Sequence, residues 1–351
     1  GHALYAPGLG FYSGGGGAGR RRDFLTSPEV GPLFGAVLAR ALDAWWDEMG
    51  RPDPFHVVEG GAGPGTLART VLAASPRCAG ALRLTLVEPA DVQWSTHPAG
   101  VASRPDLPPP ALLGGGPVVV LANELLDNLP FALVELTTEG WCEVRVGLRV
   151  DGAQRPPGSP EGPSSGSADG GDAGRGPLVE VLEPLDEVRA RWCDARAAGR
   201  ASVGSRLPVQ ADAAGWVSDA LDLAAGGRVV VVDYADRPPS LASRPWRDWL
   251  RTYAGHGRGG HPLSAPGSCD ITCERAVDQL EQDLDGLDGK VVAVLGLTFR
   301  PGVKEDAFSG AYTIVEHLAR RGARPVVHDP FYEPGEIEDR GFVPYELGAP
   351  C

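Results

Sequence analysis

Apolar positions along the chain follow two periods, that of an α-helix and that of a buried strand. Residues 27–50 carry apolar side chains at helical spacing, whereas short apolar runs occur at 55–59, 82–88 and 117–122. Helical or irregular stretches separate these runs, and this alternation is typical of βαβ units around a parallel sheet. Capping preferences predict that the first helix begins at Ser27, has Pro28 in its first turn and closes at Gly50.

The same reading predicts further elements in the second half. A hairpin is expected over 131–150 with its turn at Glu139-Gly140, and more regular structure over 178–192, 210–225 and 228–234. Between them, residues 151–177 are rich in Gly, Pro and Ser and almost free of apolar residues, which predicts a disordered insertion. A last βαβ unit is expected from 290–299, 309–322 and 324–330. The predicted fold is therefore α/β, with a mostly parallel, doubly wound sheet and a C-terminal βαβ unit.

Composition limits the classes of function. The 351 residues are 42% hydrophobic with a net charge of −14, which disfavours nucleic-acid binding because such a protein needs a basic face. No apolar run has the length of a membrane span, and no secretion signal is recognised, so we expect a cytoplasmic protein without a membrane partner. The six cysteines match no zinc or disulfide framework, and we expect reduced thiols and no metal.

The segment VVEGGAGPGTLA (57–68) places a glycine loop between a strand and a helix. It does not fit the dinucleotide pattern G-x-G-x-x-G, because Thr66 stands at the third position, nor the P-loop, because no lysine is near. A tight turn without a ligand is one alternative. The other is suggested by the pattern E-x-G-x-G-x-G, which resembles motif I of Rossmann-like S-adenosylmethionine methyltransferases. Its members here are Glu59, Gly61, Gly63 and Gly65.

Acids follow the next two predicted strands. Glu88 ends the strand 82–88, where a carboxylate can accept hydrogen bonds from both hydroxyls of a ribose. Asn123, Glu124 and Asp127 follow the strand 117–122. They would emerge where a methyltransferase binds the atom to be methylated; the alternative is a helix cap followed by solvated acids.

Several motifs over about residues 1–280 together resemble the MidA-type (DUF185) methyltransferases. They include GLGFYSGG, RDFLTSPEVGPLFG and VVLANELLDNLPF. The resemblance implies a class I methyltransferase fold, S-adenosyl-L-methionine as the cofactor and an arginine of a protein as the substrate. It implies that Gly61, Gly63, Gly65 and Glu88 bind the cofactor, that Asp23, Phe24, Thr26, Ser27, Pro28 and Glu29 form a lid over it, and that Asn123, Glu124 and Asp127 lie at the methyl-transfer site.

Methylation of arginine needs groups that orient the guanidinium and take up a proton. The guanidinium has a pKa above about 12, so carboxylates must bind it and accept the proton as the new bond forms. Glu124 and Asp127 are the candidates for that role. His256 and His261 are alternative bases, although a role in a surface loop is the competing interpretation for both.

The tail has a different character. Residues 285–351, with the segment GLTFRPGVKEDAFSG, resemble the C-terminal nucleotide-binding domain of UDP-sugar dehydrogenases, although Ala307 stands where many relatives have Arg. In this resemblance Arg300 would contact a phosphate or uridine. We expect a methyltransferase domain over 1–283 and a partial βαβ segment over 284–351 that packs on it or on a second copy in a homodimer. The alternatives to an arginine methyltransferase are a nucleotide-sugar-binding protein and an assembly scaffold with a vestigial methyltransferase domain.

Overall fold

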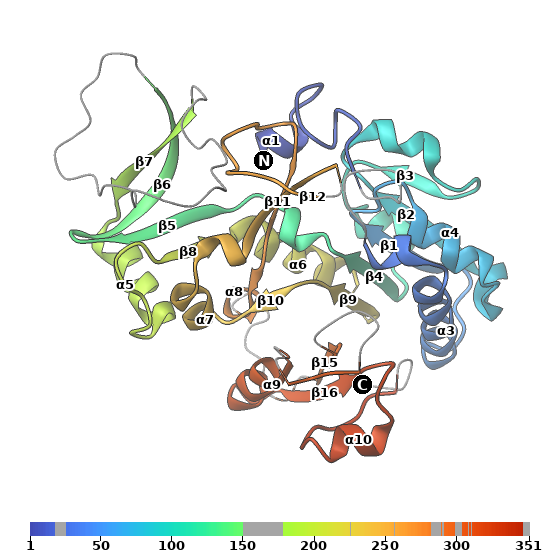
Figure 1. Ribbon diagram of the computed structural model, residues 1–351. Helices are drawn as coiled ribbons and strands as arrows, with labels where there is room; N and C mark the ends of the chain where they lie inside the picture. Colours follow the sequence, from blue (N-terminus) through green and yellow to red (C-terminus); the bar gives the residue numbers. More distant parts are fainter. Residues whose placement is uncertain are drawn as a thin grey trace.

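The computed structural model consists of a parallel sheet with its helices, an antiparallel sheet beside it and a C-terminal βαβ unit (Figure 1). It describes residues 1–17, 26–149, 178–224, 226–255, 257–281, 289, 291–298, 304–307, 309 and 311–346. The predicted insertion 151–177 lies outside these residues, as do Asp23, Phe24, His256 and Arg300. None of the helices in the described part has the length and apolar character that a membrane crossing requires.

Five parallel strands form the central sheet in the order β3-β2-β1-β4-β9. They are β1 (Phe55–Gly60), β2 (Leu82–Val87), β3 (Ala102–Arg104), β4 (Val118–Asn123) and β9 (Arg228–Val232). The apolar runs at 55–59, 82–88, 117–122 and 228–234 are therefore strands, and the predicted mostly parallel sheet is confirmed. Their carboxyl ends lie along one edge, where a doubly wound sheet binds its ligands.

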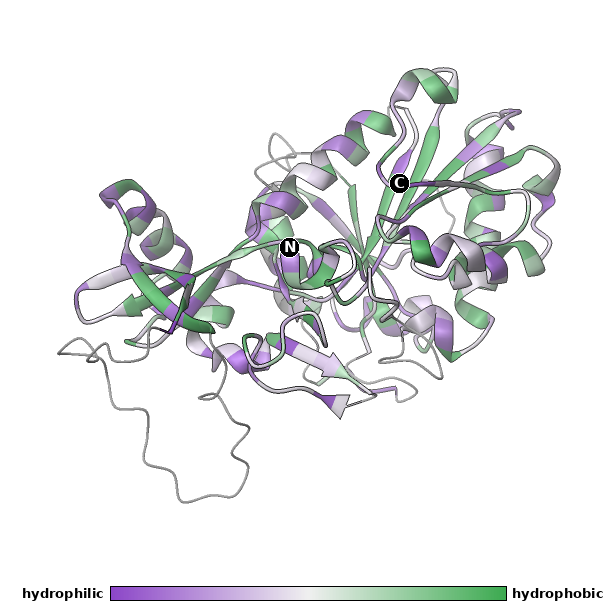
Figure 2. Cartoon of the chain, turned by 90° about the horizontal axis from the view of Figure 1, so that it is seen from above, coloured by the Kyte–Doolittle hydropathy of each residue, from purple (hydrophilic) through white to green (hydrophobic). Residues whose placement is uncertain are grey.

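Helices cover both faces of this sheet (Figure 1). Leu38 and Leu42 of α3 (Leu33–Glu48) and Leu67 of α4 (Thr66–Ala73) share a core with Val57 of β1, whereas Val58 packs with α6 (Ala211–Leu223) on the other face. Successive strand residues point to opposite faces, so a strand buried on both faces is apolar throughout. Figure 2 shows these central strands in green. The short 3-10 helices are η1 (Arg77–Gly80), η2 (Asp91–Thr96), η3 (Pro110–Leu113) and η4 (Leu126–Asn128).

The prediction of a single helix over 27–50 is wrong in one respect: two helices are present, divided at Gly31-Pro32. α2 (Ser27–Val30) ends at Gly31, which has an extended backbone, and α3 starts after Pro32. Proline restricts the residue before it to extended conformations and lacks an N–H for a helical hydrogen bond. The N-cap of α2 is Thr26 and not Ser27, and it makes no side-chain capping bond.

A four-stranded antiparallel sheet, in the order β7-β6-β5-β8, extends to one side of the central sheet (Figure 1). It contains β5 (Ala132–Thr137), β6 (Gly140–Leu148), β7 (Leu178–Pro184) and β8 (Arg206–Val209). β5 and β6 are the predicted hairpin, paired from Leu133↔Val144 to Thr137↔Gly140. The helix α5 (Glu187–Ala197) packs against one face of this sheet, where Trp141 Nε1 donates a hydrogen bond of 2.8 Å to Asp194.

Shorter elements connect the two sheets, and most of them were not predicted. They are α1 (His2–Tyr5), β10 (Ala235–Asp236), α7 (Pro238–Ser243), η5 (Trp246–Asp248), β11 (Leu250–Ala254), β12 (Gly257–Arg258), β13 (Asp270–Cys273), β14 (Arg275–Ala276) and α8 (Val277–Glu281). β11 pairs with both β12 and β13, and β10 pairs with β14. α1 lies over this region at the top of Figure 1.

The C-terminal unit consists of β15 (Val291–Leu295), α9 (Ala311–Arg320), β16 (Arg324–His328) and α10 (Pro334–Glu338). β15 and β16 are parallel, as a βαβ unit requires, and Ser309 Oγ accepts a hydrogen bond of 3.1 Å from the N–H of Ala311. Gly322 follows the helix with φ of 83°. The predicted βαβ unit is thus confirmed, whereas the predicted domain boundary at 283–284 falls outside the described residues.

Five cysteines fall in the described part, and all are buried and unpaired: Cys78, Cys142, Cys193, Cys269 and Cys273. Cys78 belongs to the core between the central sheet and α3, and Cys193 and Cys273 belong to the core beneath the antiparallel sheet. Burial raises the pKa of Cys78 to about 12 and that of Cys193 to about 11. These thiols are structural, as the sequence predicted.

Candidate cofactor and methyl-transfer site

The glycine loop joins β1 to α4 with a backbone that only glycine adopts readily. Gly61 and Gly63 have φ of 63° and 51°, in the left-handed region. A Cβ on Gly61 would lie 2.8 Å from Leu125 Cδ1, whereas a Cβ on Gly63 would meet no atom within 4 Å. Gly61 is therefore fixed by packing, and Gly63 borders open space that a ligand can fill.

Glu88, which follows β2, binds this loop directly. One carboxylate oxygen accepts a hydrogen bond of 2.9 Å from the N–H of Gly63, and the other accepts one of 2.8 Å from the N–H of Ala90. Burial raises the pKa of Glu88, and these two hydrogen bonds act in the opposite direction. Each oxygen retains a second lone pair, so the carboxylate can hold the loop and still accept from ribose hydroxyls.

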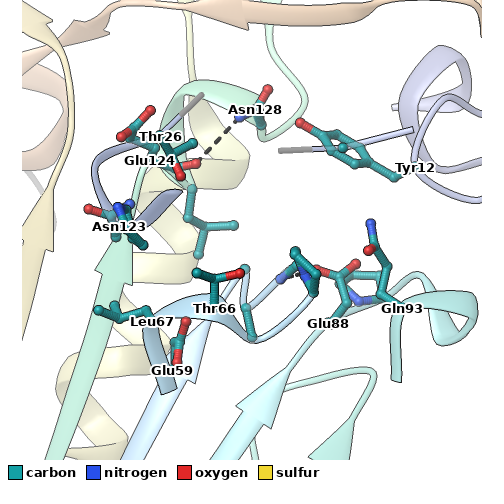
Figure 3. A pocket seen from close by; sticks show the side chains of 18 of the residues that line it. Tyr12, Thr26, Glu59, Thr66, Leu67, Glu88, Gln93, Asn123, Glu124 and Asn128 are labelled. Atoms are coloured by element: carbon teal, nitrogen blue, oxygen red, sulfur yellow. Dashed lines mark hydrogen bonds between the residues drawn. The ribbon is translucent and has the colours of Figure 1, made fainter. Parts of the chain in front are cut away.

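A cavity of about 340 Å³ opens beside the loop, at the carboxyl edge of the central sheet. In Figure 3 Glu88 and Gln93 lie on one side of it, Glu59 and Leu67 at its base, and Glu124 and Asn128 opposite. Of the predicted site residues, those that line it are Thr26, Pro28, Glu29, Glu59, Gly61, Gly63, Glu88, Asn123 and Glu124. Its volume lies within the range of small-molecule sites, about 300–1,000 Å³.

Three predicted site residues do not line the cavity. Gly65 (φ of 74°) is the N-cap of α4 and shapes the turn, and the backbone N–H of Ser27 donates to Glu124 at 3.3 Å. Asp127 is 4% exposed and lies behind the wall, where Asn128 Nδ2 donates to its Oδ1 at 3.0 Å. Asn128, one residue later, is the one that reaches the cavity.

Glu124 combines an unusual backbone conformation with a carboxyl whose pKa is raised. It directly follows β4 with φ of 50°, a backbone region that is uncommon outside glycine and costs about 1–3 kcal/mol. Burial raises the pKa of its carboxyl to about 7; the hydrogen bond from Ser27 opposes this rise, and the charge of Asp233 adds to it. A carboxyl with such a pKa can exchange a proton near neutral pH.

Asp127, Asp233 and Asp270 lie near Glu124, and the charges of Asp233 and Asp270 raise its pKa. Asp233 Oδ2 accepts hydrogen bonds from the N–H groups of Leu126 (2.8 Å) and Asp127 (3.2 Å). Burial, then the charges of Asp233 and Asp270, raises the pKa of Asp127 well above its usual value. Among the described residues the guanidinium nitrogens of Arg275, which is 1% exposed, have no hydrogen-bond partner, although its charge faces Asp233 and Asp127.

His261 does not lie at this cavity. Its Nε2 is 3.3 Å from Oε1 of Glu180, and it lines a second cavity of about 450 Å³. It is therefore not placed to act as a base beside Glu124, and His256 lies outside the described residues. The described residues also contain no group of three or more His, Cys, Asp or Glu that could hold a metal ion.

Several cavity residues were not predicted. Tyr5, Tyr12, Gln93 and Asn128 all line it. Tyr12 donates a hydrogen bond of 2.8 Å to Asp270, and burial raises its pKa, so it remains a neutral donor. The motif GLGFYSGG contains Tyr12, but nothing in its local spacing indicates contact with residues more than a hundred positions away.

The residues present fit S-adenosylmethionine. Asn123 Oδ1 and Asn128 Oδ1 are buried without a hydrogen-bond partner in the described structure, and both side chains belong to the cavity wall. Such acceptors cost free energy unless a donor reaches them. The ammonium group of the cofactor or a substrate guanidinium supplies such donors, and Glu88 offers acceptors for the ribose.

The βαβ unit has its own polar site at the end of β15. Asp329 Oδ2 accepts hydrogen bonds from the N–H of Leu297 (2.7 Å), and from the N–H and hydroxyl of Thr298 (both 2.6 Å). Lys304 contacts both carboxylate oxygens of Glu336 at 2.6 Å. Ala307 is exposed, and with Arg300 undescribed the predicted phosphate contact stays a prediction.

Comparison with known proteins agrees with this geometry. Residues 37–294 match a family described as "Putative S-adenosyl-L-methionine-dependent methyltransferase". Residues 293–346 match the UDP binding domain of the UDP-glucose/GDP-mannose dehydrogenase family. The chain is similar in structure (TM-score 0.59, 26% identity) to a COG1565 superfamily member from Burkholderia thailandensis solved with S-adenosyl-homocysteine bound. That alignment covers 80% of this chain and 68% of the other.

Curated relatives include mitochondrial proteins named as arginine methyltransferases. The NDUFAF7 homolog of Drosophila melanogaster is 30% identical over 188 residues, which cover 43% of this chain and 41% of that protein. The protein arginine methyltransferase NDUFAF7 of Homo sapiens is 26% identical over 176 residues, which cover 41% and 40%. The chain thus spans about two fifths of the length of these relatives.

Proposed function

Because the chain belongs to the S-adenosyl-L-methionine-dependent methyltransferase family that its residues 37–294 match, we propose that it methylates an arginine side chain of a protein. S-adenosyl-L-methionine is the cofactor. Arginine as the acceptor is supported by the names of the mitochondrial relatives and by the acids at the mouth of the site. The observation that carries the proposal is the Glu124 carboxyl in the cavity wall, with its pKa raised to about 7.

In this proposal Glu59, Gly61, Gly63 and Glu88 hold the cofactor, and Thr26 and Pro28 close over it. The bound cofactor supplies a methyl group on a sulfonium. A nitrogen of the guanidinium attacks the methyl carbon while the bond from that carbon to sulfur breaks, and the nitrogen loses one proton. The Glu124 carboxylate takes up that proton, and Asn123 and Asn128 orient the guanidinium by accepting its N–H groups.

Asp127 contributes indirectly in the same proposal. It lies behind the wall and holds Asn128 by a hydrogen bond of 3.0 Å. It is therefore a positioning residue whose loss would disturb Asn128 more than the proton transfer itself.

The test has two readouts, binding of S-adenosylhomocysteine by calorimetry and methylarginine formation by mass spectrometry. We expect Glu124→Gln to lower methyl transfer by about 100-fold or more and to leave S-adenosylhomocysteine binding unchanged. Glu139→Gln, in the exposed hairpin turn, is the matched control and should behave as the wild type. Methylarginine formation at the wild-type rate by Glu124→Gln would refute the role of Glu124, and methylation of another residue type would refute the substrate class.

A second candidate function is favoured by the match of residues 293–346 to a UDP binding domain. Titration of the same chain with UDP-glucose tests it. Saturable binding of UDP-glucose, without binding of S-adenosylhomocysteine, would assign the function to the C-terminal unit. No UDP-glucose binding would leave the methyltransferase as the supported function.

A further inference from the structure

The second cavity shares a wall with the cofactor cavity. Both are lined by Asn128, Leu129 and Pro130, the segment that joins η4 to β5. The second cavity, of about 450 Å³, extends from this wall between α1, the antiparallel sheet and the loop with His261. A segment bound in the second cavity would therefore lie against the wall that the two cavities share.

The floor of the second cavity is one face of the β5-β6-β7 sheet. Residues directly opposite in an antiparallel pair lie on the same face, and alternate residues share that face. The pairs Leu133↔Val144, Val144↔Leu182 and Leu148↔Leu178 place apolar residues along one face of the hairpin, and Glu180, opposite Val146, is a charged residue on the same face. We name this face, comprising Leu133, Val144, Val146, Leu148, Leu178 and Leu182, the apolar strip.

The apolar strip continues beyond the cavity into solvent. Leu133, Val144, Val146 and Leu178 line the second cavity, and the strip is partly open to solvent, with Val146 60% exposed, Leu148 70% and Leu182 40%. In Figure 2 green segments follow this hairpin up to the grey trace. Contiguous exposed apolar residues mark interaction surfaces. Residues 151–177 contain no Val, Leu, Ile, Met, Phe, Tyr or Trp, so they lack the large apolar side chains that would match the strip.

The polar side chains at the inner end of the strip are bound to one another. Arg206, which is 6% exposed, donates to both oxygens of Glu180 (2.9 and 2.5 Å) and to Glu135 (2.7 Å), and it stacks on Trp246. His261 adds a contact of 3.3 Å to Glu180. Arg206 thus pairs with Glu180, which lines the second cavity together with Arg145, and the residues named as the strip are apolar.

Resting on the proposed function, we propose that the apolar strip binds the substrate protein beside its target arginine. The bound segment carries apolar side chains, which lie along the strip, and its arginine passes the wall at Asn128–Pro130 into the cofactor cavity. The net charge of −14 favours a basic partner. The wall that the second cavity shares with the cofactor cavity favours substrate over the other occupants, a second copy of the chain or a further segment of it.

Two short fluorescent peptides test the inference by anisotropy in the presence of S-adenosylhomocysteine. Both contain one arginine; Val and Leu flank it in the first, and Ser replaces them in the second. We expect the wild type to bind the first peptide at least about tenfold more tightly. The pair Val146→Glu and Leu182→Glu should abolish that preference without changing S-adenosylhomocysteine binding. Val203→Glu, at a residue of similar exposure (62%) outside the strip, should keep it.

Equal binding of the two peptides by the wild type, binding of neither, or a preference that survives in the double variant would overturn the inference. So would sedimentation showing a wild-type dimer that the double variant dissociates, because the strip would then be an interface between copies. The same experiment distinguishes failure of the proposed function from failure of the docking surface. Strip-dependent binding without methylarginine formation would retain the docking surface and reject the activity, whereas methylation independent of the strip would do the reverse.

Discussion

At the scale of single residues, Glu124 sets the pH dependence expected of methyl transfer. The proposed step needs its carboxylate, and burial raises its pKa from 4.5 to about 7. The rate should therefore increase as pH rises through about 7 and level off above it. Single-turnover methylation from about pH 5.5 to 9 measures this. A profile that is flat across that range would assign proton uptake to another group.

Glu59 provides a prediction for stability. It is 5% exposed, and burial raises its pKa to about 8. Between 4.5 and about 8 the folded chain binds a proton that the unfolded chain has released, so stability falls as pH rises through this window. Glu59→Gln removes this penalty, and its Tm should exceed that of the wild type at about pH 9 but not at about pH 4. Equal Tm values at the higher pH would contradict the buried, protonated state.

Gly63 tests whether the open space beside the loop is the cofactor site. The backbone there has φ of 51°, and no atom lies within 4 Å of an added Cβ. Gly63→Arg should fill the cavity and abolish S-adenosylhomocysteine binding. Gly114→Arg is the control, since Gly114 also has positive φ (71°) and open space but lies away from the cavity. Calorimetry measures S-adenosylhomocysteine binding by both variants. Retained binding by Gly63→Arg would place the cofactor elsewhere.

At the scale of elements, the helix α5 depends on its N-cap. Asp186 accepts hydrogen bonds of 2.9 Å from the N–H groups of Val188 and Arg189. Asp186→Ala should lower the free energy of unfolding by about 1 kcal/mol. Glu187→Ala, at the neighbouring exposed position, should cost less. Urea titration compares the two, and equal losses would show that the cap contributes no more than a surface charge.

Sequence patterns identified the helices and strands that can be recognised from consecutive residues alone. Four strands of the central sheet, β1, β2, β4 and β9, are short apolar runs, and the last βαβ unit is framed by Ser309 and Gly322. The division of the first helix at Gly31-Pro32 was missed because the apolar period continues across the proline. β11–β13 were missed because their pairing joins Leu250 to Cys273 across a glycine-rich stretch that has no alternating pattern.

The site was predicted where its residues follow strands directly. Glu88 and Glu124 each follow a parallel strand, and the topology of the sheet brings them to one cavity. Asp127 was assigned to the reaction because it lies near Glu124 in sequence, but the short helix η4 turns it behind the wall and presents Asn128 instead. Tyr12 reaches the cavity through contact with Asp270, which only the tertiary fold determines.

At the scale of the whole molecule, Arg275 links the central sheet to the strands β13 and β14. Its charge faces Asp127 and Asp233 from β14. Arg275→Met should destabilise the chain at about pH 8, because it removes a positive charge that faces the Asp233 carboxylate. Burial raises the pKa of Asp233 to about 6, so the loss should be smaller at about pH 5. Thermal unfolding at both values measures this, and an equal loss would indicate a packing effect alone.

Two cores of the described structure, that between the central sheet and α3 and that beneath the antiparallel sheet, hold buried thiols, and this makes their opening separately measurable. Cys78 lies in the core of the central sheet, and Cys193 in that of the antiparallel sheet. A buried thiol with a raised pKa reacts with an alkylating reagent only when its surroundings open. The alkylation rate of each cysteine, followed by peptide mapping, therefore reports the opening free energy of its own half. A bound cofactor should slow the modification of Cys78 more than that of Cys193, because the cofactor cavity adjoins the first core.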